Sequence, residues 1–298
     1  MKKHLLALAI TALAAGSAFA QANDTLAKIK ASGTITEGVR ESSGLSFTLG
    51  DGKYTGFHYD VCARVISDIQ KHLGLAKLET KYQPVTSQNR IPLVQNGTVD
   101  IECGTTTNNA ARQKDVAFAP TLYVEGIRVG VKSTSTITTT AQLAGKSVAA
   151  TTGSTSVQAL RKIKRDGSEL NEVLAKDNAE GFLLLESGRA EAFVADGQIL
   201  ATLISKSKDS GQYKLLDQVL SVEPIAIMIR KDDPAFKKVV DDSVGALAKS
   251  GEVARLYDKW FMQPIPPSNT KVGLPANALT KEAWAKPNDK PLEAYGER

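Results

Sequence analysis

The sequence is poor in the residues that most enzymes use for acid–base and metal chemistry. Its 298 residues include 3 histidines and 2 cysteines, and aromatic residues make up 6%. His4 belongs to an N-terminal leader, and neither His58 nor His72 has a cysteine or a second histidine at ligand spacing, so no metal and no cofactor are expected. No G-x-S-x-G motif occurs, and the remaining acid–base candidates, Glu41 and Glu125, form no obvious pair. We therefore expect a protein that is not an enzyme.

The chain also lacks a large excess of one charge and long apolar runs. Lys and Arg number 37 against 32 Asp and Glu, and the two signs are interspersed, so nucleic acid is not an expected partner. Beyond the leader, no apolar run reaches the roughly 20 residues that a membrane-spanning helix needs. A chain of this length exceeds what one compact core usually fills, which predicts two lobes.

The first 20 residues have the pattern of a secretory signal. Lys2 and Lys3 precede an apolar stretch over residues 5–15, and Ala18-Phe19-Ala20 fits an A-x-A cleavage site. We expect cleavage after Ala20 and a soluble mature protein in an exported compartment. No cysteine follows the cleavage site, so a lipid anchor is not expected there.

The two cysteines, Cys62 and Cys103, are expected to point into one core. Cys62 falls on the apolar face of a predicted helix, and Cys103 lies on the inward face of a predicted strand over residues 99–103. An exported compartment favours oxidation, so we favour a disulfide, which would stabilise the fold by roughly 4 kcal/mol in the chain-entropy model. The alternative is two buried free thiols, because cysteine is common in cores.

Short β-branched runs alternate with helical patterns along the rest of the chain. The predicted strands cover residues 34–40, 78–84, 99–103, 127–132, 147–150, 192–195 and 225–230. The predicted helices cover residues 56–73, 88–96, 156–165, 179–187, 198–206, 234–250 and 252–261. Strands separated by such helices form βαβ units, so we expect an α/β fold with mostly parallel sheets. The last thirty residues or so, rich in Pro, Asn and Lys, predict an irregular surface tail.

Two extended apolar segments, 123–128 and 222–227, indicate where the chain passes between lobes. Two such crossings would enclose residues 127–221 as an inserted second lobe. Residues 21–126 and 222–298 would then form a discontinuous first lobe. Two sequential lobes would leave much the same local signals, so both arrangements stay open at this point. In open α/β sheets, ligands bind beyond the carboxyl ends of the strands.

Hydroxyl and guanidinium side chains follow several of the predicted strands. Arg40 ends the first strand, and the second leads into Ser87 and Arg90 at the start of a helix. Arg112 lies in a first turn after the third strand, and a later strand ends at Asp196. Hydroxyl-rich runs at residues 104–109 and 151–156 follow that third strand and the strand over residues 147–150. Helix N-termini with hydroxyls bind anions, and an arginine in a first turn opposes the helix dipole unless it faces an anion.

These residue types fit a small ligand that carries more than one carboxylate and an ammonium group. Guanidinium binds carboxylate in a bidentate manner, and Asp196 suits the ammonium. At any single position, a helix cap or a surface arginine is the simpler interpretation. Because the whole set falls at strand ends, we favour a binding site.

Several longer runs carry a resemblance to a known family. Residues 56–61 (GFHYDV), 97–100 (GTVD) and 256–261 (LYDKWF) resemble the polar amino-acid-binding proteins of bacterial ATP-binding-cassette importers. Further runs resemble the glutamate/aspartate-binding members of that family: 40–43 (RESS), 86–93 (TSQNRIPL), 102–109 (ECGTTTNN), 112–114 (RQK) and 230–234 (RKDDP). The similarity spans essentially the whole mature chain.

The resemblance implies a two-lobed periplasmic-binding-protein fold of type II, with a two-strand hinge that closes on the ligand. It implies a periplasmic protein that captures L-glutamate or L-aspartate and delivers it to the importer's membrane permease. We expect such a protein to act as a monomer.

The matching motifs also imply a role for individual residues. The α-carboxylate would be held by Arg112, helped by Thr107 and Thr155. The α-ammonium would be held by Asp196, with a contribution from Thr105. The distal carboxylate would be held by Arg40, Ser87 and Arg90.

The sequence departs from the family pattern at three positions. Asn178 stands where the family has His, Thr105 where it has Ser, and Gly197 where it has a second Asp. Asn178 can donate a hydrogen bond to a carboxylate but carries no charge, so glutamine or asparagine is an alternative ligand. A periplasmic dehydratase or lyase on the same scaffold is a second alternative. A sensor that acts through a membrane receptor is a third.

Overall fold

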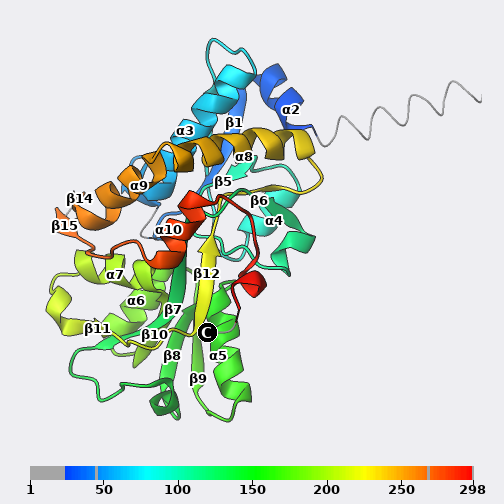
Figure 1. Ribbon diagram of the computed structural model, residues 1–298. Coiled ribbons are helices and arrows are strands. Elements are labelled where there is room, and N and C mark those ends of the chain that lie inside the picture. The colour runs from blue at the N-terminus through cyan, green and yellow to red at the C-terminus, as the bar shows by residue number, and fades with distance from the viewer. Residues whose placement is uncertain (1–23, 44–45, 267–268, 297–298) are drawn as a thin grey trace, which may run out of the picture.

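The computed structural model describes residues 24–43, 46–266 and 269–296, and Figure 1 shows two lobes joined by extended strands. The expected signal, residues 1–20, lies outside the described residues. Among the helices that the structure describes, none is long and apolar enough to cross a membrane.

The first lobe is built on a five-stranded sheet of order β4-β1-β5-β13-β6. Its strands are β1 (Thr34–Val39), β4 (Glu79–Pro84), β5 (Ile101–Glu102), β6 (Val116–Phe118) and β13 (Met228–Arg230). Its helices are α2 (Thr25–Ser32), α3 (Phe57–His72), α4 (Arg90–Gln95), α8 (Pro234–Lys249) and α9 (Glu252–Tyr257). The apolar faces of α3, α8 and α9 enclose one core, in which Phe57, Phe236 and Phe261 are fully buried.

The second lobe is built on a sheet of order β11-β7-β10-β8-β9, with β12 also paired to β7. Its strands are β7 (Tyr123–Lys132), β8 (Ser147–Thr151), β9 (Asn171–Ala175), β10 (Ala192–Asp196), β11 (Tyr213–Leu215) and β12 (Ser221–Ile225). Its helices are α5 (Thr155–Arg165), α6 (Asn178–Glu186) and α7 (Gly197–Lys206). Apolar clusters lie on both faces of this sheet, one containing Leu160 of α5 and the other Leu185 of α6 and Leu200 of α7.

The two-lobed α/β class is confirmed, but both sheets are mixed. β1 pairs in parallel with β4 and β5, and β8 pairs in parallel with β9 and β10, as βαβ units require. β7 and β13 run antiparallel to their neighbours. Each of these two strands lies where the chain passes between the lobes. Each therefore enters its sheet from the end opposite to that at which the parallel strands enter.

The two-strand hinge is formed by β7 and β12, which pair antiparallel from Tyr123↔Ile225 to Ser221↔Ile127. Figure 1 shows these strands running between the lobes. The single strand predicted over residues 225–230 is wrong, because β12 ends at Ile225 and β13 begins at Met228. The short break between them lets the chain pass from one sheet to the other.

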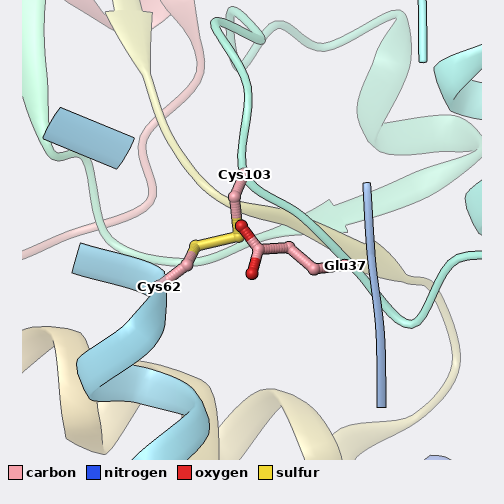
Figure 2. Close-up of side chains that lie close together, drawn as sticks. All are labelled: Glu37, Cys62 and Cys103. Carbon is pink, nitrogen blue, oxygen red and sulfur yellow. A yellow bond between two sulfur atoms is a disulfide. The ribbon is translucent and has the colours of Figure 1, made fainter. Parts of the chain in front are cut away.

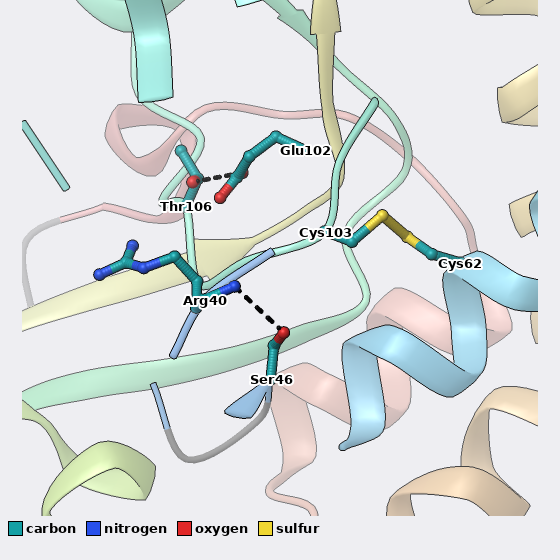
Figure 3. Close-up of a disulfide and its surroundings, with 6 residues drawn as sticks. All are labelled: Arg40, Ser46, Cys62, Glu102, Cys103 and Thr106. Carbon is teal, nitrogen blue, oxygen red and sulfur yellow. Dashed lines mark hydrogen bonds between the residues drawn. A yellow bond between two sulfur atoms is a disulfide. The ribbon is translucent and has the colours of Figure 1, made fainter. Parts of the chain in front are cut away.

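The disulfide between Cys62 of α3 and Cys103 is confirmed, with a Cα–Cα distance of 6.3 Å. Both cysteines are fully buried in the core of the first lobe. Cys103 directly follows β5, so the disulfide ties the end of that strand to α3 (Figure 3).

The C-terminal segment is more ordered than the predicted irregular tail. It contains α10 (Ala278–Ala285), which Asn277 caps by accepting a hydrogen bond from Thr280 N at 2.8 Å. Trp284 Nε1 donates to Leu122 O at 2.6 Å, and Thr280 Oγ1 accepts from Val124 N at 3.0 Å. The segment therefore braces β7 where it enters the hinge.

Short elements complete the described chain. They are β2 (Phe47–Gly50), β3 (Lys53–Thr55), β14 (Pro264–Ile265), β15 (Thr270–Lys271), the 3₁₀ turns η1 (Arg112–Lys114), η2 (Thr140–Leu143), η3 (Ser210–Gln212) and η5 (Leu292–Tyr295), and the π-helical turn η4 (Asp258–Met262).

Candidate ligand-binding site

A small cavity lies between the lobes and brings together most of the predicted site residues. Seven of the nine line it: Ser87, Arg90, Thr105, Thr107, Thr155, Asn178 and Asp196. All seven are buried. Residues far apart in the sequence meet here because the strand ends of both sheets face each other across the cavity.

Local turns place these side chains. Before α4, Thr86 Oγ1 accepts from Asn89 N at 3.2 Å and Asn89 Oδ1 accepts from Thr86 N at 2.8 Å, which fixes the turn that carries Ser87. Asp196 is the last residue of β10 and the N-cap of α7, yet its side chain makes no capping bond within the described residues. Its carboxylate therefore stays available to the cavity.

The distal end of the cavity contains buried donors. Arg90 Nη1 donates to Thr105 O at 2.9 Å, and Arg40 Nη2 donates to Ser87 Oγ at 3.0 Å. Arg40 itself is not among the described lining residues, so it stands behind Ser87. Burial lowers the pKa of Arg40 to about 10, a value at which the guanidinium is still protonated at neutral pH.

Three donors in this region have no hydrogen-bond partner in the described part of the chain. They are Arg40 Nη1, Arg90 Nε and Asn178 Nδ2. Buried polar groups are normally hydrogen-bonded, so such a group of donors indicates a ligand with acceptor atoms. The orientation of Asn178 is fixed by Thr151 Oγ1, which donates to its Oδ1 at 2.8 Å.

Arg112 lies behind the lining and reaches both lobes. Its Nη1 donates to Thr107 O at 2.8 Å, and its Nη2 donates to Gly153 O at 3.4 Å. Burial, with the neighbouring charge of Arg90, lowers the pKa of Arg112 to about 9. Gly153 has φ +79°, and a Cβ there would lie 2.7 Å from Gln88 Cα, so only glycine allows the lobes this close.

The surroundings of Asp196 disfavour the ionised form of its carboxyl group. Burial is the main cause that raises the pKa of Asp196 to about 7, and Glu223 and Glu125 add to it. Arg90 and Arg112 act in the opposite direction. A cationic group in the cavity would favour the ionised carboxylate.

The sequence hypothesis missed four lining residues: Ser154, Ser156, Ala195 and Ile199. The hydroxyl-rich run over 151–156 was the available signal for the two serines. It also missed Glu223, which is fully buried and accepts hydrogen bonds from Thr107 Oγ1 and Thr155 Oγ1. Glu223 lies within the extended crossing segment, where the apolar pattern gave no reason to expect a functional carboxylate.

The acid–base candidates do not gather at the cavity. Glu41 is exposed, and Glu125 Oε1 accepts from Gly126 N at 3.0 Å in its own strand. His58 is fully buried, and burial lowers its pKa to about 3, so the imidazole is neutral. None of these three is among the described residues that line the cavity.

One group of metal-ligand residue types occurs in the described chain: Glu37, Cys62 and Cys103. Figure 2 shows the Glu37 carboxyl beside the disulfide. The two sulfurs are bonded to each other and offer no thiolate. Burial raises the pKa of Glu37 to about 8, so this carboxyl is neutral at pH 7 and the group as it stands does not suit a cation.

The disulfide lies next to the loop that supplies lining residues. Cys103 is followed by the segment that contains Thr105 and Thr107. Figure 3 shows two further anchors of this region: Arg40 N donates to Ser46 Oγ at 3.3 Å, and Thr106 Oγ1 donates to Glu102 Oε2 at 2.7 Å. The cavity wall of the first lobe is thus held by covalent and hydrogen bonds.

Comparison with known proteins identifies the scaffold. Residues 35–263 match the model of the bacterial extracellular solute-binding proteins, family 3. An L-glutamate/L-aspartate-binding protein of Pseudomonas aeruginosa is 44% identical over 272 residues, which cover 90% of each chain. A glutamate/aspartate import solute-binding protein of Escherichia coli is 40% identical over 296 residues, covering 96% of this chain and 98% of the relative.

Solved structures agree on the fold. An ancestral amino acid-binding protein, described as a precursor of cyclohexadienyl dehydratase, superposes with a TM-score of 0.68 at 27% identity, covering 80% of this chain and 99% of the other. An ancestral arginine-binding protein bound to arginine gives a TM-score of 0.68 at 28% identity, covering 77% and 98%.

Proposed function

Because the chain belongs to family 3 of the bacterial extracellular solute-binding proteins, we propose that it captures L-glutamate or L-aspartate between its lobes. It then delivers the amino acid to the membrane permease of an ATP-binding-cassette importer. Like its relatives, which are named as binding proteins, the chain is a solute-binding protein and not an enzyme. Closure stabilises the loaded state, which is the state that a permease can recognise.

The observation that carries this proposal is the set of unpartnered buried donors that lie at the distal end of the cavity or, in the case of Arg40, directly behind its lining. Arg40 Nη1, Arg90 Nε and Asn178 Nδ2 have no hydrogen-bond partner in the described chain. A side-chain carboxylate offers two oxygens with about four acceptor positions and no donor. A side-chain amide would turn its own NH₂ toward one of these donors. The acidic amino acids therefore fit better than glutamine or asparagine.

The other end of the cavity suits the α-carbon groups. Arg112 stands beside the first turn of α5, where backbone N–H groups have no partner within the helix. Ser154 Oγ, at the N-cap of this helix, is buried without a partner in the described residues. An α-carboxylate would satisfy this end, and Asp196 would take the α-ammonium.

We also propose the division of the chain and its location. Residues 21–126 and 222–298 form the first lobe and residues 127–221 the second, so both boundaries fall within the hinge strands β7 and β12. The other strands of each sheet support this division. Residues 1–20 form a cleaved signal that sends the protein to the periplasm, supported by the basic start and the A-x-A site. The protein acts as a monomer.

Replacing Arg112 tests the site. Arg112→Ala removes the partner of a buried carboxylate, so L-glutamate affinity measured by calorimetry should fall by at least about 100-fold. Arg161→Ala, an exposed arginine of α5 paired with Glu172, is the control and should bind as the wild type does. Unchanged affinity in Arg112→Ala would refute this placement of the α-carboxylate.

A further inference from the structure

Glu223 holds two hydroxyls of the cavity wall. It lies on β12 and is fully buried. Its Oε2 accepts hydrogen bonds from Thr107 Oγ1 at 2.5 Å and from Thr155 Oγ1 at 2.8 Å, while its Oε1 accepts from Ser221 Oγ at 2.5 Å. One carboxylate of the hinge therefore joins a hydroxyl of the first lobe to a hydroxyl of the second.

These bonds fix what the two hydroxyls can offer to a ligand. A hydroxyl has one proton and two lone pairs, and each of these two hydroxyls donates its proton to Glu223 Oε2. Thr107 and Thr155 both line the cavity, and because both hydroxyl protons are used on Glu223, their Oγ1 atoms have only lone pairs left for a ligand. The cavity lining also includes Asp196, a third acceptor.

An ammonium group is the ligand group that matches three acceptors, since it has three N–H donors and no lone pair. We propose that Glu223 is a positioning residue that orients the Thr107 and Thr155 hydroxyls, so that their lone pairs and Asp196 together select an α-ammonium. This inference rests on the proposed amino-acid-binding function and adds Glu223 to it as a positioning residue.

The assignment of the two threonines changes as a result. The family resemblance implied that Thr107 and Thr155 help to hold the α-carboxylate. With their protons committed to Glu223, the hydroxyls cannot donate to a carboxylate, and that group is left to Arg112 and the first turn of α5.

Two variants and two ligands test the proposal. Glu223→Met removes both acceptor and charge, whereas Glu223→Gln removes the charge but keeps a carbonyl oxygen that can accept both hydroxyl protons while its NH₂ faces Ser221. The ligands are L-glutamate and glutarate, which has the same carbon chain without the amino group. Calorimetry with protein that was unfolded and refolded gives the ratio of the two dissociation constants.

In Glu223→Met, L-glutamate should bind about 10- to 100-fold more weakly, as expected when an ammonium loses hydrogen bonds, while glutarate binds as well as before or better. Glu223→Gln should restore most of the preference for L-glutamate. Ser221→Ala, which removes only the bond to Oε1, should bind both ligands as the wild type does. Equal losses for both ligands in Glu223→Met would overturn the proposal, as would equal losses in the Met and Gln variants.

Two further outcomes can be distinguished from a failure of the proposal: a variant that does not fold and a wild-type protein that binds no amino acid. If Glu223→Met does not fold, Thr107→Val is measured instead: a selective loss for L-glutamate supports the proposal, and an equal loss for both ligands overturns it. If wild-type protein binds no amino acid at all, the proposed function itself fails and this inference falls with it.

Discussion

At the residue scale, the guanidinium groups of the site are held in place before any ligand arrives. Arg90 Nη1 donates a hydrogen bond to Thr105 O, and Arg112 Nη1 donates one to Thr107 O. These bonds fix the direction of each side chain and so reduce the entropy that binding must overcome. Asp196 differs, because burial opposes its charge and no helix-capping bond compensates within the described residues. Its ionisation is therefore linked to ligand binding.

This linkage predicts a pH dependence of affinity. The ligand's ammonium favours ionised Asp196, so the pKa of this carboxyl is lower in the complex than the value of about 7 to which burial raises it in this structure. Below pH 7 binding must then release a proton, and L-glutamate should bind about 30-fold more weakly at pH 5.5 than at pH 8. Calorimetry across this range measures it. Asp196→Asn should bind weakly with a flat profile, and a flat profile in the wild type would contradict the account.

Most of the predicted site residues do line the cavity, but the sequence did not show how far from the cavity each side chain lies. The rule that ligands bind beyond strand ends selected Ser87, Arg90 and Asp196, which do line the cavity. The rule did not predict that Arg40 and Arg112 lie behind the residues that line the cavity. The position of a long side chain depends on which carbonyl or hydroxyl it contacts, and the sequence pattern does not show this. Glu223 was missed because its partners are 116 and 68 residues away in the sequence.

At the scale of elements, the disulfide joins α3 to the end of β5. Both cysteines lie in the apolar core with Phe57 and Ile101. The loop that follows Cys103 supplies Thr105 and Thr107 to the cavity. The covalent bond therefore stabilises the wall of the site as well as the core of the first lobe.

Removing the disulfide should lower stability substantially. The bond closes a loop with a sequence separation of 41 residues, for which the chain-entropy model gives about 4 kcal/mol. The double variant Cys62→Ala/Cys103→Ala should lose about this much free energy of unfolding in a denaturant titration. Wild-type protein titrated with a reducing agent should show a similar loss. Equal midpoints for the variant and the oxidised wild type would count against a structural role.

Elements with strong periodicity were predicted closely, and elements set by tertiary contacts were not. The helix expected over residues 56–73 is Phe57–His72, because its apolar face repeats regularly. The strand expected over 225–230 breaks into two, because the chain changes sheets there. Helix α10 was missed because a composition rich in Pro and Asn hides the Asn277 cap and the Trp284 anchor on the hinge.

At the scale of the whole molecule, the lobes approach each other through contacts that only small groups allow. Gly153 of the second lobe faces the backbone of Ser87 and Gln88 in the first lobe. Arg112 Nη2 donates to Gly153 O and Thr107 Oγ1 donates to Glu223 Oε2, and both hydrogen bonds cross the same gap. These contacts describe a closed arrangement that the ligand would stabilise further.

Gly153→Ala should impede closure without preventing folding. Its Cβ would lie 2.7 Å from Gln88 Cα, and overpacking of about 1–3 kcal/mol predicts that L-glutamate affinity, measured by calorimetry, falls about 5- to 150-fold. Gly145→Ala is the matched control: Gly145 has a similar φ of +73°, and no atom of the described chain lies within 4 Å of its added Cβ. Both variants should lose similar stability, and only Gly153→Ala should lose affinity. Wild-type affinity in Gly153→Ala would contradict this view of closure.

The central claim is that the site selects an acidic amino acid, and thermal unfolding against a ligand panel tests it most directly. The mature protein, freed of bound ligand by unfolding and refolding, is heated with L-glutamate, L-aspartate, L-glutamine or L-asparagine. A ligand at a thousand times its dissociation constant stabilises by roughly 4 kcal/mol, and each kcal/mol raises Tm by roughly 2–4 °C. We predict a large shift with L-glutamate or L-aspartate and little with the amides. A shift with the amides alone, or with none of the four, would contradict the claim.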